Sequence, residues 1–183
     1  MENNKLTGDI PACLFNIKGL KYLFLGGNNL IWNNNTKIVP KFMFYGLSMK
    51  SCGLVGQIPY CISTQKTLVS LDLSENHLEG MFPLWLAEMN LFYLILLDNN
   101  LKGSLPPSLF NNTKLQVLSL SRNNFYGELP SNIGNASLMV LGLFSLAHEE
   151  SPSNKAQNPS HCFLLTCDTR VLVYTRFWAA TNT

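Results

Sequence analysis

Charged residues are scarce in this chain. They make up 13% of its 183 residues, against about 25% in typical domains. Lysine and arginine together outnumber aspartate and glutamate by only two, 13 to 11. Nucleic acids and acidic membrane surfaces attract a much larger basic surplus. The composition therefore argues against both as partners.

Catalytic motifs are also missing. The sequence contains no G-x-S-x-G, no H-E-x-x-H and no phosphate-binding glycine loop. His77 lies beside a repeat marker where we expect a turn, and the other two histidines lie far away in the C-terminal tail. Asp72 and Glu75 are close in sequence, but paired carboxylates act through pKa shifts that need a pocket. We predict a protein that is not an enzyme and needs no cofactor or metal.

Long apolar runs are absent as well. The first eleven residues show no basic segment followed by an apolar stretch, so no signal peptide is visible. Residues 162–180 are apolar, but Asp168, Arg170 and Arg176 interrupt them. A membrane span needs roughly 20 predominantly apolar residues. We predict no membrane insertion by this chain.

What the sequence does contain is a repeat. Six marker residues are spaced by 24, 24, 24, 23 and 24 positions: Asn4, Asn28, Cys52, Asn76, Asn99 and Asn123. An apolar frame, L-x-x-L-x-L-x-x-N/C-x-L, recurs around the markers, for example from Leu68 to Leu78. Because one such unit cannot bury its apolar side alone, consecutive units must stack into a solenoid. We predict this solenoid over residues 1–146, with about six to seven repeats.

The L-x-L part of the frame predicts a short strand, whose side chains alternate between core and solvent. In one repeat, Leu71 and Leu73 face the core while Ser70, Asp72 and Ser74 face outward. The marker Asn or Cys follows, where it can pair with buried backbone groups of stacked copies. Cys52 is therefore interpreted as a buried structural thiol. Cys13 and Cys61 lie two turns apart, about 10 Å, which is too far for a disulfide.

The outward positions of the strands form the candidate binding face. The large apolar side chains there are typical of binding hot spots, although they could instead pack against each other and only stabilise the sheet. These are Tyr22, Phe24, Tyr93, Ile95 and Leu97. The charged side chains could fix the register of a bound peptide or form an ordinary solvated rim. These are Lys50, Asp72, Glu75, Asp98 and Arg122.

Three N-x-S/T triplets are candidate glycosylation sites, at Asn34, Asn111 and Asn135. The last two occupy the same register of the repeat, between its Pro and the next strand. Sugars there would decorate the outer side and leave the strand face clear.

Two segments depart from the repeat. Residues 31–36 replace the expected Gly and Ile-Pro of the second repeat, which predicts an irregular turn. Residues 147–183 lose the frame, and we expect this tail to be poorly ordered; an intron read-through or a frameshift would produce it. Cys162 and Cys167 in the tail could pair with each other or bind a metal.

The segments NKLTGDIP (Asn4 to Pro11), CGLVGQIP (Cys52 to Pro59) and Leu118 to Ser137 resemble the plant-specific extracellular class of leucine-rich repeats. The irregular second repeat is most similar to receptor-like proteins of the disease-resistance kind. The resemblance implies an α/β leucine-rich-repeat solenoid: a right-handed superhelix with a parallel sheet on the concave face and short helical or 3₁₀ turns on the convex face. It also allows an additional sheet built from the G-x-I-P segments.

The resemblance further implies a non-catalytic recognition module of a plant receptor-like protein in defence or signalling, at the outer face of the plasma membrane. Its concave strand face would bind a peptide or protein ligand, with a co-receptor as a further partner. The alternative is a secreted inhibitor of a cell-wall-degrading enzyme, of the polygalacturonase-inhibitor type. Because the chain begins in mid-repeat, we expect it to be an internal fragment or a shortened gene model of a longer protein.

Overall fold

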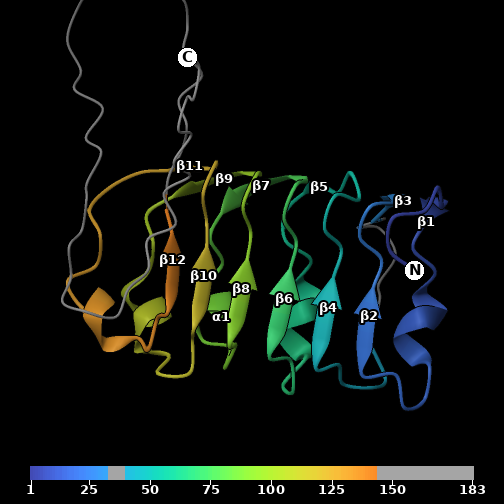
Figure 1. The fold of residues 1–183 in the computed structure, drawn as a ribbon, viewed down its shortest axis with the longest axis horizontal. Coiled ribbons are helices and arrows are strands. Elements are labelled where there is room, and N and C mark those ends of the chain that lie inside the picture. Colours follow the sequence, from blue (N-terminus) through green and yellow to red (C-terminus); the bar gives the residue numbers. More distant parts are fainter. Residues whose placement is uncertain (33–39, 144–183) are drawn as a thin grey trace, which may run out of the picture.

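The structure is a computed structural model that describes residues 1–32 and 40–143. The predictions for Asn34, for the end of the irregular turn and for the tail with Cys162 and Cys167 lie outside these residues. Within them the chain forms consecutive windings that stack along one axis, as Figure 1 shows. Each winding contributes one strand of a long sheet, and the predicted solenoid is confirmed.

Six short strands form the long sheet, one from each L-x-L segment. In spatial order, which is also chain order, they are β2 (Tyr22–Phe24), β4 (Gly46–Ser48), β6 (Ser70–Asp72), β8 (Tyr93–Ile95), β10 (Val117–Ser119) and β12 (Val140–Gly142). Neighbouring strands are parallel, and their central leucines are in register, from Leu23 through Leu71 to Leu141. The constant repeat length makes this register inevitable, because a shift by one residue would turn every leucine out of the core.

A second set of short strands runs along the G-x-I-P segments, where the resemblance allows an additional sheet. It consists of the pair β1 (Thr7–Asp9) and β3 (Asn29–Ile31), and of β5 (Val55–Gly56), β7 (His77–Met81), β9 (Asn100–Gly103) and β11 (Asn124–Phe125). Gly80 and Gly103 adopt φ of +92° and +95°, a region that L-residues rarely visit. His77 begins β7, so our expectation that it lies on a turn is wrong.

Short helical segments of the described residues lie on the side of the solenoid away from the long sheet (Figure 1). They are η1 (Ala12–Asn16), η2 (Tyr60–Thr64), α1 (Leu84–Ala87), η3 (Pro107–Asn111) and η4 (Ile133–Asn135). Their apolar residues, such as Phe15, Ile62 and Phe110, are buried against the leucines of the strands. The core is therefore one continuous stack that runs the length of the described solenoid.

The marker residues from Asn28 to Asn123 form a buried spine, as expected, whereas the first marker, Asn4, is exposed. The Asn76 side chain accepts hydrogen bonds from the backbone N–H groups of Cys52 and Leu54, at 3.0 and 2.9 Å. It donates to the carbonyl oxygens of Met49 and Leu73, both at 2.9 Å. Each such amide therefore ties one winding to the preceding one and pairs backbone groups that have no access to water.

Candidate functional site

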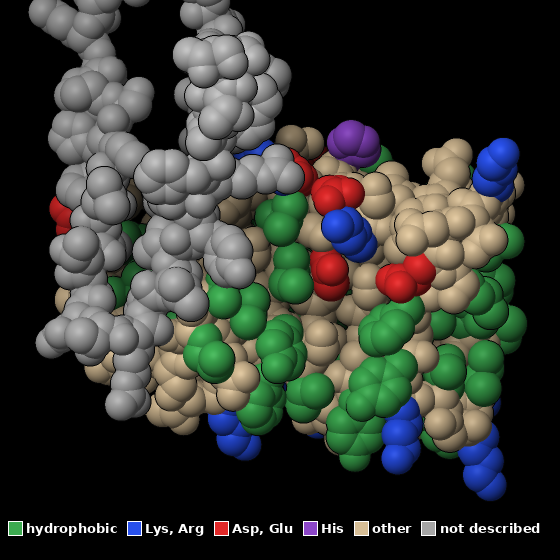
Figure 2. All heavy atoms as spheres, in the orientation of Figure 1, with side chains coloured by type: hydrophobic (Ala, Val, Ile, Leu, Met, Phe, Trp, Pro, Cys, Tyr) green, Lys and Arg blue, Asp and Glu red, His purple; other side chains and the backbone are tan. Residues whose placement is uncertain are grey.

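The exposed side of the six-stranded sheet, from β2 to β12, is the candidate site, and we call it the strand face. Two outward rows of side chains cross it from strand to strand. One row contains Tyr22, Gly46, Ser70, Tyr93, Val117 and Val140; the other contains Phe24, Ser48, Asp72, Ile95, Ser119 and Gly142. Figure 2 shows hydrophobic side chains along one half of this face and charged side chains along the other.

The aromatic residues predicted for this face are accessible to a partner. Tyr22 is 57% exposed, Phe24 42% and Tyr93 41%, whereas Ile95 and Leu97 are half-buried. Aromatic groups contribute strongly to interfaces when a partner covers them. The structure thus presents three of the five predicted apolar residues as open surface and the other two as partly covered.

Tyr45 extends the aromatic group next to β2, and our sequence interpretation missed it. Its ring centroid lies 6.4 Å from that of Tyr22, which is 5.9 Å from that of Phe24. The ammonium group of Lys21 lies 5.5 Å from the Tyr45 centroid, within cation–π range. Tyr45 directly follows the residue at the first leucine position of its repeat. The outward columns that we considered begin one residue later, at Gly46. The rings do contact each other, as the packing alternative expects, while leaving much of their surface in water.

The charged residues lie together where the strands end. The Lys50 ammonium group contacts the Glu75 carboxylate at 2.9 Å, and the Arg122 guanidinium group forms a two-point ion pair with the Asp98 carboxylate. Hydrogen bonding to Glu75 raises the pKa of Lys50 above its usual value. Hydrogen bonding to Arg122 lowers the pKa of Asp98. Four of the five predicted charged residues are therefore paired with one another across neighbouring windings.

Asp72 differs from the other carboxylates of the face. Its Oδ1 atom accepts hydrogen bonds from the backbone N–H of Ser74 at 2.9 Å and from the Ser74 hydroxyl at 2.5 Å. Ser74 itself is buried, although its hydroxyl meets the side chain of Asp72 on the face. Among the described residues, no cation lies within ion-pair distance of Asp72.

The backbone at the end of each strand takes a left-handed conformation that orients the charged residues. Ser51, Glu75, Asp98 and Arg122 all have φ between +54° and +56°. They occupy the same position, directly before the marker. The sequence places them in one column, but only the structure shows that this corner is left-handed and aligns Asp98 with Arg122.

The predicted glycosylation sites on the described part of the chain lie away from the strand face. Asn111 ends η3 and Asn135 ends η4, and both are exposed. The side-chain Oδ1 atom of Asn111 accepts a hydrogen bond from the side-chain amide of Asn132 at 2.8 Å. Sugars at either position would leave the strand face uncovered.

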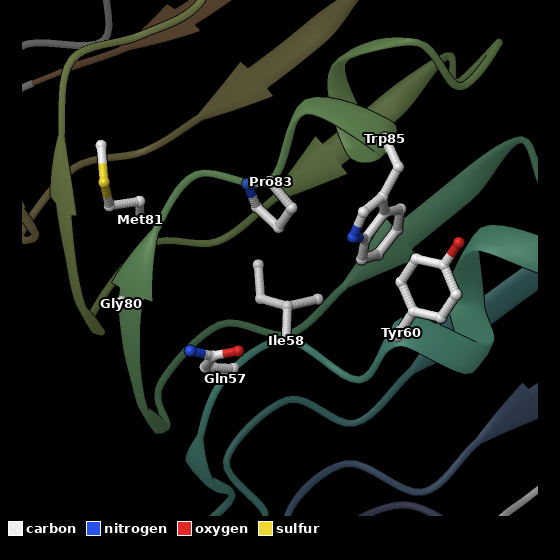
Figure 3. A pocket seen from close by; sticks show the side chains of 7 residues that line it. All are labelled: Gln57, Ile58, Tyr60, Gly80, Met81, Pro83 and Trp85. Atoms are coloured by element: carbon white, nitrogen blue, oxygen red, sulfur yellow. The ribbon is translucent and has the colours of Figure 1, made fainter.

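A shallow hollow of about 350 Å³ lies on the other side of the solenoid, between β7 and the helical segments (Figure 3). Its lining includes Gln57, Ile58, Pro83 and the aromatic pair Tyr60 and Trp85, whose rings meet edge-to-face at 6.0 Å. Trp85 of α1 thus packs against the neighbouring winding that contains Tyr60. The hollow contains no charged side chain.

The cysteines of the described residues are unpaired. Cys52 is fully buried in the marker spine, and its Sγ atom lies 3.3 Å from the Leu25 carbonyl oxygen. Burial raises the pKa of the Cys61 thiol to about 11. Groups of His, Cys, Asp or Glu that could hold a metal ion are not found in the part of the chain that the structure describes. Within the same part, no helix is long and apolar enough to span a membrane.

Comparisons with known proteins place this geometry in context. The model of the Leucine Rich Repeat family matches residues 67–89 and 114–136. Receptor-like protein 46 of Arabidopsis thaliana is 52% identical over 99 residues, which cover 53% of this chain and 12% of that protein. Receptor-like protein 35 of the same plant is 34% identical over 122 residues, 62% of this chain and 13% of that protein. The chain thus spans about an eighth of the length of these curated relatives.

A solved structure with the same fold is the plant peptide hormone receptor RGFR1 in complex with RGF2. It has a TM-score of 0.69 and 32% identity, and the match covers 79% of this chain and 23% of the receptor. Another, with the same identity and TM-score, is the Arabidopsis receptor kinase HAESA in complex with the peptide hormone IDA and the co-receptor SERK1. That match covers 79% of this chain and 24% of the compared chain.

Proposed function

We propose that this chain, which belongs to the plant leucine-rich-repeat family, is a non-catalytic recognition module that binds a peptide or protein on its strand face. The observation that carries the proposal is the group of exposed aromatic side chains on an uncovered sheet, with Tyr22 57% and Tyr93 41% exposed. Partly exposed aromatic rings of this kind gain most when a partner removes them from water.

The similar structures support a peptide as ligand. RGFR1 and HAESA are described in complex with the peptide hormones RGF2 and IDA, and HAESA also with a co-receptor. By analogy we propose a peptide or protein ligand, and a co-receptor as a second partner, for the longer receptor-like protein to which this chain is similar. A role in defence or signalling at the cell surface is part of the same proposal.

The experiment compares two tyrosines that the fold places on opposite sides. Tyr93 lies on the strand face, whereas Tyr60 is 72% exposed on the helical side. The chain is panned against phage-displayed random nine-residue peptides, and the selected peptides are measured by fluorescence anisotropy. We expect Tyr93→Ser to weaken binding at least tenfold and Tyr60→Ser to leave it unchanged. Binding that is lost with Tyr60→Ser but kept with Tyr93→Ser would contradict the proposal.

An inhibitor of a cell-wall-degrading enzyme would use the same face for a different partner. Adding the chain to a polygalacturonase assay separates the two functions, because a recognition module for signalling peptides leaves hydrolysis unaffected.

Glycosylation at Asn111 and Asn135 is tested in the secretory pathway. The chain is fused to a secretory signal and expressed in plant cells. We expect Thr113→Ala and Ser137→Ala each to remove one glycan, seen as a step in electrophoretic mobility that PNGase F treatment abolishes. Identical mobility of wild type and both variants would contradict glycosylation at Asn111 and Asn135.

A further inference from the structure

The middle of the strand face carries small side chains between two groups of large ones. Tyr22 and Phe24 lie on β2, and Tyr93 and Ile95 lie on β8. Between them, Gly46 and Ser48 of β4 are small and buried, with the Tyr22 ring against Gly46, whereas Ser70 and Asp72 of β6 are partly exposed. Figure 2 shows the hydrophobic side chains of the face in two separate groups. A ligand that crosses the face therefore meets apolar surface, then a polar strip, then apolar surface again.

The polar strip is negatively charged. Of the three carboxylates predicted for the face, Glu75 forms an ion pair with Lys50 and Asp98 with Arg122. No cation of the described residues lies within ion-pair distance of Asp72, although Lys50 is near enough to interact with it electrostatically. Both hydrogen bonds that Asp72 accepts end on Oδ1, so its Oδ2 atom keeps its acceptor capacity for a ligand. The five charged residues of the strand face are three carboxylates and two cations, so together they carry a net charge of −1.

We propose that the ligand is an extended peptide that places a lysine or arginine at Asp72, flanked on both sides by apolar residues. This inference rests on the proposed function and adds the chemistry of the ligand. A cationic side chain at Asp72 would form a charge-assisted hydrogen bond with Oδ2, whereas an acidic side chain would be repelled.

The strand spacing sets the spacing of the ligand residues. Adjacent parallel strands lie about 4.8 Å apart, so β2 and β8 are separated by three spacings, about 14 Å. An extended peptide advances about 3.4 Å per residue and directs every second side chain to the same side, so residues i and i+4 are also about 14 Å apart. The expected motif is apolar-x-basic-x-apolar, with the basic residue at i+2.

The test uses the peptides selected from the random nine-residue library on the full chain. We expect peptides whose binding depends on Tyr93 to be enriched in apolar-x-basic-x-apolar. A synthetic peptide of this pattern should bind at least tenfold more weakly when its basic residue is replaced by glutamate. Asp72→Asn keeps an oxygen for the Ser74 hydrogen bonds but loses the charge, and it should weaken binding of the basic peptide about tenfold, the loss of one charge-assisted hydrogen bond.

Glu79→Gln is the matched control, because Glu79 is an exposed carboxylate on β7, outside the strand face. It should leave the affinity unchanged. Two results would overturn the inference and leave the proposed function standing. One is that selected peptides whose binding depends on Tyr93 lack a basic residue. The other is that a basic peptide binds Asp72→Asn as tightly as wild type. Selected peptides whose binding does not depend on Tyr93 would overturn both. Thermal melting of each variant confirms that it is folded.

Discussion

The ring of Tyr22 lies across Gly46 of the neighbouring strand. A methyl group at Gly46 would sit 2.8 Å from the Tyr22 Cδ1 atom and 3.3 Å from the Phe24 Cε1 atom, closer than carbon atoms ordinarily approach. The backbone of Gly46 has an ordinary strand conformation, so the residue is small here because a ring occupies the place of its side chain. The position of the Tyr22 ring thus depends on Gly46, a residue without a side chain that could itself contact a ligand.

The first prediction concerns this contact. Gly46→Ala should push the exposed Tyr22 ring off β4 with a change in unfolding free energy of about 1 kcal/mol or less, because the ring can move into solvent. Binding of strand-face peptides should weaken, since the apolar surface is displaced. Gly134→Ala is the control, because a methyl group there meets nothing within 4 Å. Equal affinity of the two variants would contradict a binding role for the ring.

The second prediction concerns the buried spine. Asn76→Ala leaves the N–H groups of Cys52 and Leu54 and the Met49 carbonyl oxygen without this partner, whereas the Leu73 carbonyl oxygen keeps its hydrogen bond from Asn99. Each unpaired buried group costs about 1–3 kcal/mol, so we expect the unfolding free energy to fall by about 3 kcal/mol or more in urea titrations. Asn100→Ala, at an exposed position of β9, should change it by no more than about 0.5 kcal/mol. Similar losses in both variants would rule out the spine as the cause.

The third prediction is that Cys52→Asn stabilises the protein. Asn28, Asn76, Asn99 and Asn123 each accept a hydrogen bond from a leucine N–H in the preceding winding. The Cys52 thiol donates to the carbonyl oxygens of Leu25 and Lys50, and its sulfur is only a weak acceptor for a backbone N–H of the preceding winding.

An Asn at this position can make both kinds of hydrogen bond, and we expect the unfolding free energy to rise by about 1 kcal/mol. Differential scanning calorimetry measures the change, and Cys52→Ala is the comparison that should lower stability. A lower melting temperature for Cys52→Asn than for Cys52→Ala would contradict the prediction.

The fourth prediction concerns pH. Because Arg122 lowers the pKa of Asp98 in the folded state, the pair contributes stability that is fully present above the unfolded pKa, about 3.9. This contribution disappears as the pH falls through the folded pKa. As the pair is partly exposed, with side-chain exposures of 43% and 31%, we expect it to contribute about 1 kcal/mol or less.

Urea unfolding of wild type and Asp98→Asn measures this contribution. The two should differ at pH 7 and converge at pH 2. Salt at about 1 M should also reduce the difference at pH 7, since screening weakens exposed pairs. If the difference in unfolding free energy between wild type and Asp98→Asn grew on acidification, the expected pH dependence would be contradicted.

Much of the candidate site follows from the repeat. Tyr22, Phe24 and Tyr93 were assigned to the outward columns by counting from the marker, and the structure exposes them. Tyr45 was missed because the strand face extends one column further than the L-x-L segment. The alternation of the frame could not show that Ser74 is buried, because its burial depends on the Asp72 side chain that its hydroxyl contacts and on the neighbouring windings.

The sequence alone determines that this protein is a stack of equal windings, because a steady period fixes which residues are buried and which strands are neighbours. The tertiary structure decides how side chains of different windings meet: that Arg122 reaches Asp98, that the Tyr22 ring takes the place beside Gly46, and that no cation of the described residues forms an ion pair with Asp72. Such contacts depend on the left-handed corner and on the rotamers of long side chains. A repeat pattern counts positions along the chain and contains no information on these directions.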